Sequence, residues 1–145
     1  MGEDEEADRE LRIAIANDFA LLSGANDALE AFLLRWQLKP EVVFSARLAL
    51  EEVVTNIIKY AYADADTHQI DIEALIGEEE VVLRITDDGR EFDVLSAAPP
   101  DLQKPLEERP PGGLGIHIVR SIARRIEYKR AEGRNKLLLS IALNP

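Results

Sequence analysis

The sequence predicts a two-layer α/β sandwich, in which helices cover one face of a mostly antiparallel, mixed β-sheet. Two observations carry this prediction. Segments in which apolar and polar residues alternate occur near both ends and in the middle of the chain, and segments with apolar residues at helical spacing separate them. The chain shows no internal repeat, so we expect residues 9–145 to form a single domain that follows a disordered acidic leader, residues 1–8.

The first part of the chain predicts one strand and two helices. Residues 11–15 alternate in polarity as a half-buried strand does, and residues 18–36 carry apolar side chains at helical spacing. Pro40 stands where a second helix begins, and that helix is expected to run to about Tyr62. Its core-facing side is expected to combine Ala46, Leu50, Val53, Val54, Ile57, Ile58 and Ala61.

The other side of this helix carries a narrow stripe formed by Ser45, Ala49, Glu52, Asn56 and Lys59. Glu52 and Asn56 are four residues apart, so a carboxylate and an amide project to the same place. Glu51 points about 140° away from Asn56, so the two adjacent acids are not equivalent. Taken alone, such a pair is typical of a solvated helix face.

A hairpin is predicted for residues 68–87. Asp87 shares its strand face with Leu83 and Ile85, so a carboxylate points toward the apolar side at the end of the strand. A buried carboxylate is costly unless a donor bonds to it, which makes Asp87 a candidate functional residue. The alternative is that the strand has simply ended before this residue.

Residues 90–111 contain five of the seven prolines, so no regular element is predicted there. A loop of this length is typical of a lid, a binding loop or a disordered segment. The glycine-rich turn at residues 112–115 then opens a helix, whose N–H groups and positive end favour an anion such as phosphate. The alternative is a tight loop that merely enters a helix. Two closing strands are predicted at residues 126–131 and 136–143, turned at residues 133–135.

The composition excludes several classes of function. A net charge of −11 argues against sequence-independent nucleic-acid binding and suits a partner with a basic surface. Cysteine is absent, which excludes disulfides and thiolate chemistry, and the presence of only two histidines argues against a zinc site. No apolar run approaches the roughly 20 residues that span a bilayer. No signal-peptide pattern is evident, so we expect a cytoplasmic protein.

Three signals follow one another in a fixed order: Glu52-Val-Val-Thr-Asn56 on a helix, Asp87-Asp88-Gly89 after a strand, and Gly112-Gly-Leu-Gly115 at the start of another helix. Together they resemble the N box and the two glycine boxes of the GHKL (Bergerat) ATP-binding fold, which histidine kinases, gyrase-type ATPases and Hsp90 chaperones share. From about Val42 onward the chain is most similar to the bacterial anti-sigma factor serine/threonine-protein kinases. A histidine kinase would need a phospho-accepting helix in addition, and we expect none here.

The resemblance implies ATP and Mg²⁺ as cofactors, and it assigns roles to individual residues. Asn56 would be the Mg²⁺ ligand through its amide oxygen, because Mg²⁺ favours few protein ligands together with phosphates and waters. Glu52 would accept the proton from the attacking hydroxyl of a substrate serine. Asp87 would hydrogen-bond the adenine amino group, and Gly89 would let the backbone pass under the base.

At the phosphate end, the resemblance places Gly113, Leu114 and Gly115 against the phosphates, with backbone N–H groups of the two glycines as donors. Arg109, on a lid of about residues 92–111, would contact the terminal phosphate. The alternative for Arg109 is an exposed arginine that pairs with water or a carboxylate.

The chain departs from the family pattern at two places. Glu91 stands where members often carry a second glycine, and no threonine is found near residues 134–137 to support the adenine-binding aspartate. Two neighbours of the motifs are given ordinary roles. We expect Lys59 to be a solvated lysine rather than a phosphate contact, and His117 to pack beside the site as a helix residue.

The function implied by the resemblance is an ATP-dependent protein-serine kinase that acts as an anti-sigma factor. It would phosphorylate a serine on an anti-anti-sigma (STAS-type) protein, sequester a sigma factor or similar regulator, and form a homodimer, without contacting nucleic acid or a membrane. Two alternatives stay open: a non-catalytic ATP-binding regulatory module, or a detached histidine-kinase catalytic domain. The Glu52–Asn56 pair favours the kinase, because a pure binder needs Asn56 for the metal but no proton acceptor at Glu52.

Overall fold

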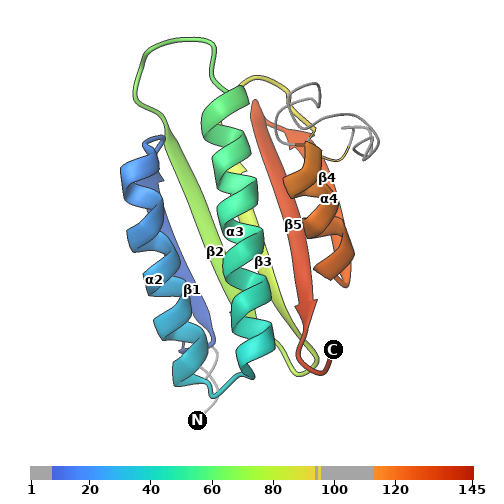
Figure 1. Ribbon diagram of the computed structural model, residues 1–145. Coiled ribbons are helices and arrows are strands. Elements are labelled where there is room, and N and C mark those ends of the chain that lie inside the picture. The colour runs from blue at the N-terminus through green and yellow to red at the C-terminus, as the bar shows by residue number, and fades with distance from the viewer. Residues whose placement is uncertain (1–7, 94, 96–112) are drawn as a thin grey trace.

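The computed structural model describes residues 8–93, 95 and 113–145 as one five-stranded sheet with helices on one of its faces (Figure 1). In chain order the elements are β1 (Glu10–Ala16), α2 (Phe19–Arg35), α3 (Pro40–Tyr60), β2 (Gln69–Ile76), β3 (Glu80–Asp87), α4 (Gly113–Ile122), β4 (Arg125–Ala131) and β5 (Arg134–Ala142). The strand order is β1-β2-β3-β5-β4, and all four pairings are antiparallel. The predicted two-layer architecture is confirmed, and the described sheet is antiparallel rather than mixed.

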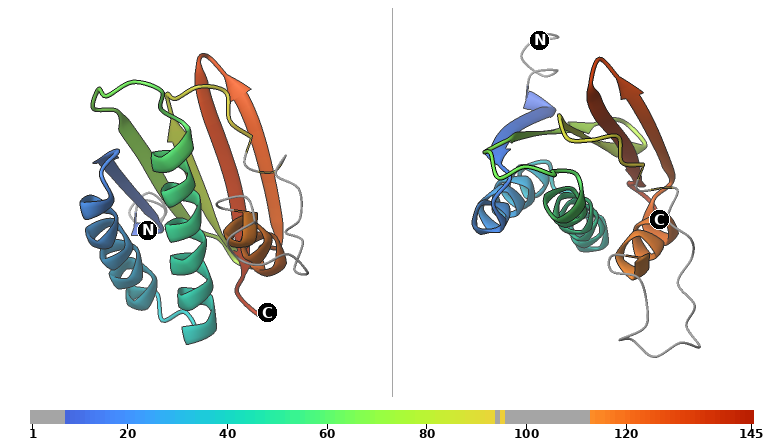
Figure 2. Two further views of the ribbon diagram at one scale, coloured as in Figure 1. Left: turned by 45° about the horizontal axis from the view of Figure 1, so that its top comes forward. Right: turned by 90° about the horizontal axis from the view of Figure 1, so that it is seen from above.

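The three helices lie on the same side of the sheet, as the view from above shows (Figure 2). This arrangement follows from the period-two pattern, which turns Ile70 and Ile72 of β2 and Leu83 and Ile85 of β3 toward the helices. These side chains and Leu50 of α3 are essentially buried. Full burial of such a side chain stabilises the fold by roughly 1.5–3 kcal/mol, so this layer holds the site's elements in place.

Helix boundaries follow local signals. Asp18 caps α2 by accepting a hydrogen bond from the backbone N–H of Ala20 (2.9 Å), and Pro40 opens α3 as predicted. The second helix ends at Tyr60 rather than Tyr62. Among the described helices, none is long and apolar enough to cross a membrane.

The predicted polar stripe of α3 is wrong in one respect. Ala49 and Asn56 are buried, with exposed fractions of 0% and 3%, because α4 packs along this side of α3. Conversely, Ile58, which was assigned to the core face, is only partly buried. The sequence pattern of α3 alone could not reveal a helix that comes from a distant part of the chain.

The last hairpin also differs from the prediction. Its turn is formed by Glu132 and Gly133, both with positive φ, whereas Arg134 and Asn135 already belong to β5. Gly133 has a φ of 73°, a conformation that glycine adopts without strain. The shift of the turn brings Asn135 into the sheet, directly opposite Asp87 of β3.

Candidate functional site

The sequence motifs meet at one end of the helix-covered face. The end of α3, the end of β3, the start of β5 and the start of α4 all lie at the same end of the molecule (Figure 1). Asn56 lies one turn from the end of α3, Asp87 is the last residue of β3, and Gly115 lies in the first turn of α4. Segments far apart in the sequence therefore supply one site.

Asn56 carries a buried side-chain amide near the end of α3. The residue is only 3% exposed, and its side chain forms no hydrogen bond with another described residue. A nearly buried amide with no partner among the described residues can bind a ligand or a water. This environment is consistent with an amide that binds a ligand.

Glu52 lies against the first turn of α4. A Cβ atom added to Gly115 would be 1.9 Å from the Oε2 atom of Glu52, so only glycine permits this approach. The first N–H groups of a helix have no intrahelical acceptor and carry partial positive charge, which favours a carboxylate or phosphate nearby. Glu52 thus stands beside the helix start that was predicted to hold an anion.

Asp87 is buried, 2% exposed, at the end of its strand. Its Oδ1 atom accepts hydrogen bonds from the backbone N–H of Gly89 and from Nδ2 of Asn135, both at 2.9 Å. Burial raises the pKa of Asp87, and the two hydrogen bonds oppose this shift by favouring the charged form. Its Oδ2 atom has no hydrogen-bond partner among the described residues, so one carboxylate oxygen is available to a ligand.

Gly89 allows a close approach between the loop after β3 and the end of α3. A Cβ atom on Gly89 would lie 2.5 Å from the carbonyl oxygen of Ala61. The same carbonyl accepts a hydrogen bond from the backbone N–H of Arg90 (2.8 Å), and the Arg90 Nε donates to the carbonyl of Tyr60 (2.8 Å). A larger residue than glycine therefore does not fit at position 89 without a shift of the backbone.

Asn135 is a site residue that sequence reasoning missed. Besides the bond to Asp87, its Nδ2 donates to the carbonyl of Arg90 (2.7 Å), and its Oδ1 accepts from the backbone N–H of Phe92 (3.2 Å). The signal was present in the sequence, since Asn135 lies two residues before Leu137 and shares its face. The misplaced turn concealed it.

A second cluster lies next to the end of β3. The ring of His68 stacks on Tyr62 with centroids 4.4 Å apart, and its nitrogens lie 2.7 Å from Oδ1 of Asp64 and 3.0 Å from Oδ1 of Asp88. The hydrogen bond to Asp64 raises the pKa of His68, and Asp88 adds to the effect. Burial, together with the charges of Asp87 and Asp88, raises the pKa of Tyr62.

The other predicted site residues lie in or near α3 and α4, apart from one that the structure does not describe. Gly113 and Leu114 begin α4, as the glycine-rich turn predicted. Lys59 is exposed, in keeping with a solvated lysine. His117 is a residue of α4, as expected, but its side chain is exposed rather than packed. Arg109, with most of the predicted lid, lies outside the described residues.

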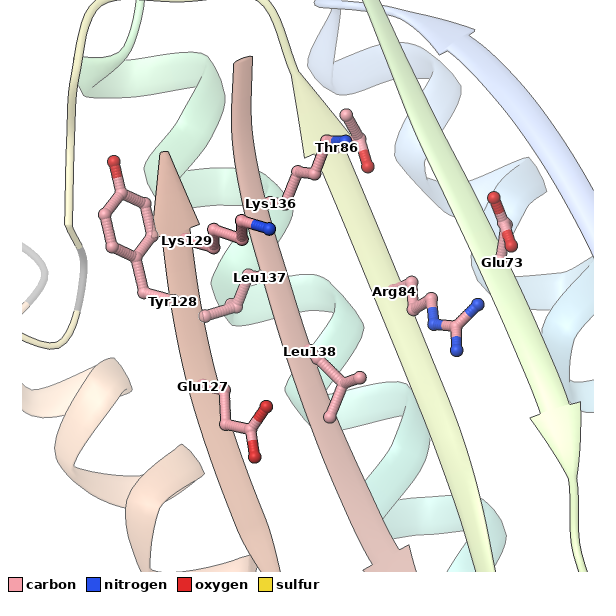
Figure 3. Close-up of a pocket in the computed structure, with 9 residues that line it drawn as sticks. All are labelled: Glu73, Arg84, Thr86, Glu127, Tyr128, Lys129, Lys136, Leu137 and Leu138. Carbon is pink, nitrogen blue, oxygen red and sulfur yellow. The ribbon is translucent and has the colours of Figure 1, made fainter. Parts of the chain in front are cut away.

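A hollow of the described surface lies away from this site. A cavity of about 730 Å³ lies on the open face of the sheet, with Arg84, Lys129 and Lys136 among its lining residues (Figure 3). The helices lie on the other side of the sheet (Figure 3). Within the described residues, no group of three His, Cys, Asp or Glu side chains could hold a metal ion.

The curated proteins that are similar to this chain include two protein kinases. The serine/threonine-protein kinase BtrW of Bordetella bronchiseptica is 30% identical over 119 residues, which cover 80% of this chain and 84% of that protein. The serine-protein kinase RsbW of Bacillus cereus is 30% identical over 96 residues, which cover 63% of this chain and 59% of that protein. The chain thus spans less than two thirds of the second relative.

A solved structure has the same fold as this chain, and a family model matches its sequence. The RsbU and RsbW domains of a Mycobacterium tuberculosis protein share the fold, with a TM-score of 0.64 at 14% identity over 91% of this chain and 32% of that one. The histidine kinase-like ATPase domain matches residues 15–141. This match covers most of the chain, and the described architecture is that of the related structure. The chain therefore belongs to the family of histidine kinase-like ATPase domains.

Proposed function

We propose that this protein is an ATP-dependent protein-serine kinase that acts as an anti-sigma factor in a partner-switching module. The observation that carries the proposal is the position of Glu52, whose carboxylate lies against the start of α4, one helical turn from the buried amide of Asn56. A proton acceptor beside an anion-favouring helix start is the arrangement that phosphoryl transfer to a hydroxyl requires. The kinase names of the two relatives support the same activity.

The residues present fit Mg²⁺ and the phosphates of ATP. Asn56 has a buried amide with no protein partner among the described residues, and one such oxygen is enough for an ion that takes its other ligands from phosphates and water. When bound, the ion would neutralise negative charge on the phosphates. Gly113, Leu114 and Gly115 open α4, where backbone N–H groups would hold the phosphates. Arg109 is proposed to contact the terminal phosphate.

At the other end of the site, Asp87 is proposed to bind the base. Its free Oδ2 atom would accept a hydrogen bond from the adenine amino group, and Gly89 keeps the adjoining loop close to the end of α3. A hydrogen bond from an amino group to a carboxylate is stronger where water is excluded, and Asp87 is buried.

In the proposed reaction, Glu52 accepts the proton of a substrate serine hydroxyl. A bond forms between the serine oxygen and the γ-phosphorus of ATP, and the bond from that phosphorus to the bridging oxygen breaks. The products are a phosphoserine and ADP, and the proton passes from Glu52 to solvent. Such a positioned acceptor contributes about 10²–10⁴-fold to the rate.

The proposed partners are a STAS-type anti-anti-sigma protein, which carries the serine, and a sigma factor or similar regulator. The net charge of −11 supports a partner that presents a basic surface. We further propose a homodimer of single-domain chains in the cytoplasm, with residues 92–111 as a lid over the nucleotide.

The test combines binding and transfer. Calorimetry with Mg²⁺ and ATP should show binding by the wild type and by Glu52→Ala, and its loss in Asn56→Ala. Transfer of phosphate to a serine-bearing anti-anti-sigma protein should fall about 10²–10⁴-fold in Glu52→Ala. Glu51→Ala is the matched control, because Glu51 is exposed and points away from the site.

The alternatives give different outcomes in this experiment. Binding without transfer would indicate a non-catalytic regulatory module, and transfer only to a histidine-bearing protein would indicate a detached histidine-kinase catalytic domain. Failure of the wild type to bind ATP would overturn the nucleotide assignment itself.

A further inference from the structure

We propose that Asn135 is the positioning residue that gives the site its preference for a 6-amino purine over a 6-oxo purine. The inference rests on the proposed function, because it concerns how Asp87 reads the base. One side chain, only 4% exposed, connects this carboxylate to the loop that follows it. Asn135 therefore sets both the direction and the charge of the carboxylate oxygen of Asp87 that would bind the base.

The two carboxylate oxygens of Asp87 have different roles. Oδ1 is occupied by two donors, the Gly89 N–H and the Asn135 Nδ2, each at 2.9 Å. This leaves Oδ2 as the oxygen that can accept from a ligand. An exocyclic amino group donates to it, whereas the carbonyl of a 6-oxo purine would face it as a second acceptor and leave two buried acceptors unpaired.

The charge of Asp87 decides whether its carboxyl group can only accept a hydrogen bond or can also donate one. Burial disfavours the carboxylate, and a protonated carboxyl could donate to a 6-oxo group as readily as it accepts from a 6-amino group. The hydrogen bond from Asn135 favours the ionised form, which can only accept. Asn135 therefore favours the protonation state of Asp87 on which the discrimination depends.

The orientation of the Asn135 amide is set by its hydrogen bonds. Its Oδ1 atom faces three donors: the Phe92 N–H (3.2 Å), the Tyr128 hydroxyl (2.6 Å) and the Arg130 Nη1 (3.2 Å). A flipped amide would set its NH₂ group against the Phe92 and Arg130 donors. The amide is thus held with its NH₂ group toward Asp87.

The same amide also holds the loop after β3 at the place where the family often has a second glycine. Asn135 donates to the carbonyl of Arg90 (2.7 Å) and accepts from the N–H of Phe92, so it brackets Glu91 from both sides. Glu91 is not among the described residues with positive φ, so a glycine is not required there. The two hydrogen bonds of the Asn135 side chain hold this loop in place.

The experiment compares ATP and GTP binding to the full chain with Mg²⁺, by calorimetry, between pH 6 and pH 8.5. The wild type should favour ATP throughout. Asn135→Asp removes the donor and places a second carboxylate against Asp87. At pH 8.5 ATP binding should weaken at least tenfold and the preference over GTP should shrink at least fivefold. ATP binding should recover toward pH 6, where the two carboxyls can share a proton.

The charged and titratable groups around this pair are Asp88 on the same loop, Tyr62 after α3, and Tyr128 and Arg130 on β4. His68 contacts Asp88, but it does so in every variant, so the difference from wild type isolates the new pair. Asn144→Asp is the matched control, because it makes the same substitution at an exposed asparagine near the C-terminus, whose side chain contacts Lys39 rather than Asp87. It should stay within about twofold of wild type for both nucleotides.

Asn135→Thr keeps the inference testable if Asn135→Asp fails to fold, as judged by circular dichroism. A threonine hydroxyl can still donate to Asp87 but cannot bracket Glu91, so both nucleotides should bind more weakly at an unchanged ATP-to-GTP ratio. An unchanged ratio and pH profile in Asn135→Asp, or a ratio altered in Asn135→Thr, would overturn the inference while the wild type still binds ATP. A wild type that binds neither nucleotide would overturn the proposed function, and the inference with it.

Discussion

Nδ2 of Asn135 donates a 2.9 Å hydrogen bond to Oδ1 of Asp87, across the β3–β5 pairing in which the two residues are direct partners. The bond connects a residue of a sequence motif with one that lies outside every motif. Because both side chains are buried, each satisfies a polar group that would otherwise be costly to bury. The end of the sheet is in this way built to present one carboxylate oxygen.

Gly115→Ala should impair the site at its catalytic end. The new Cβ would lie 1.9 Å from Oε2 of Glu52, so the carboxylate must move away from the start of α4. We expect serine phosphorylation to fall by about 10²-fold or more, since a displaced acceptor no longer contributes its share. Gly24→Ala is the control, because nothing lies within 4 Å of its added Cβ, and full activity in both variants would contradict the prediction.

Gly89→Ala should act mainly on stability. Its Cβ would lie 2.5 Å from the backbone carbonyl oxygen of Ala61, and a backbone atom cannot rotate away as a side chain can. We expect the free energy of unfolding in urea to fall by about 1–3 kcal/mol, the usual cost of overpacking. Gly24→Ala, in α2, should instead be neutral or stabilising by up to about 1 kcal/mol. Equal stability of the two variants would argue against the close approach.

Asp87→Asn should stabilise the ligand-free protein and abolish adenine recognition. Burial raises the folded-state pKa of Asp87 above its unfolded value of 3.8, so the ionised carboxylate opposes folding at pH values above that raised pKa. The melting temperature of the variant should therefore exceed that of wild type at pH 7. This difference should shrink as the pH falls toward 4. Asp66→Asn, at an exposed loop position, should show no such trend.

His68→Gln should reveal a pH-dependent contribution of the opposite sign. The folded-state pKa of His68 is raised above 6.5, chiefly by its hydrogen bond to Asp64. The stabilisation is thus fully present below pH 6.5 and is lost as the pH rises through the raised pKa. The melting-temperature gap between wild type and variant should be larger at pH 6 than at pH 8.5. His117→Gln, at an exposed position of α4, should give a gap that does not vary in this way.

Local patterns determined much of this protein before any tertiary information. The alternation in β3 placed Asp87 on the inner face, and the four-residue spacing placed Glu52 and Asn56 on one side of α3. Proline marked the start of α3, and glycines marked the start of α4. These features depend on residues within a few positions of one another, so the sequence carries them in full.

The tertiary structure alone decided which distant residues meet. The β3–β5 register set Asn135 opposite Asp87, and the packing of α4 on α3 buried Asn56 and brought Gly115 against Glu52. Register and helix packing result from the fit of whole hydrophobic faces, which no local spacing encodes. The sequence by itself therefore determined the elements and the motif residues. Packing between distant segments decided how those residues combine into a site.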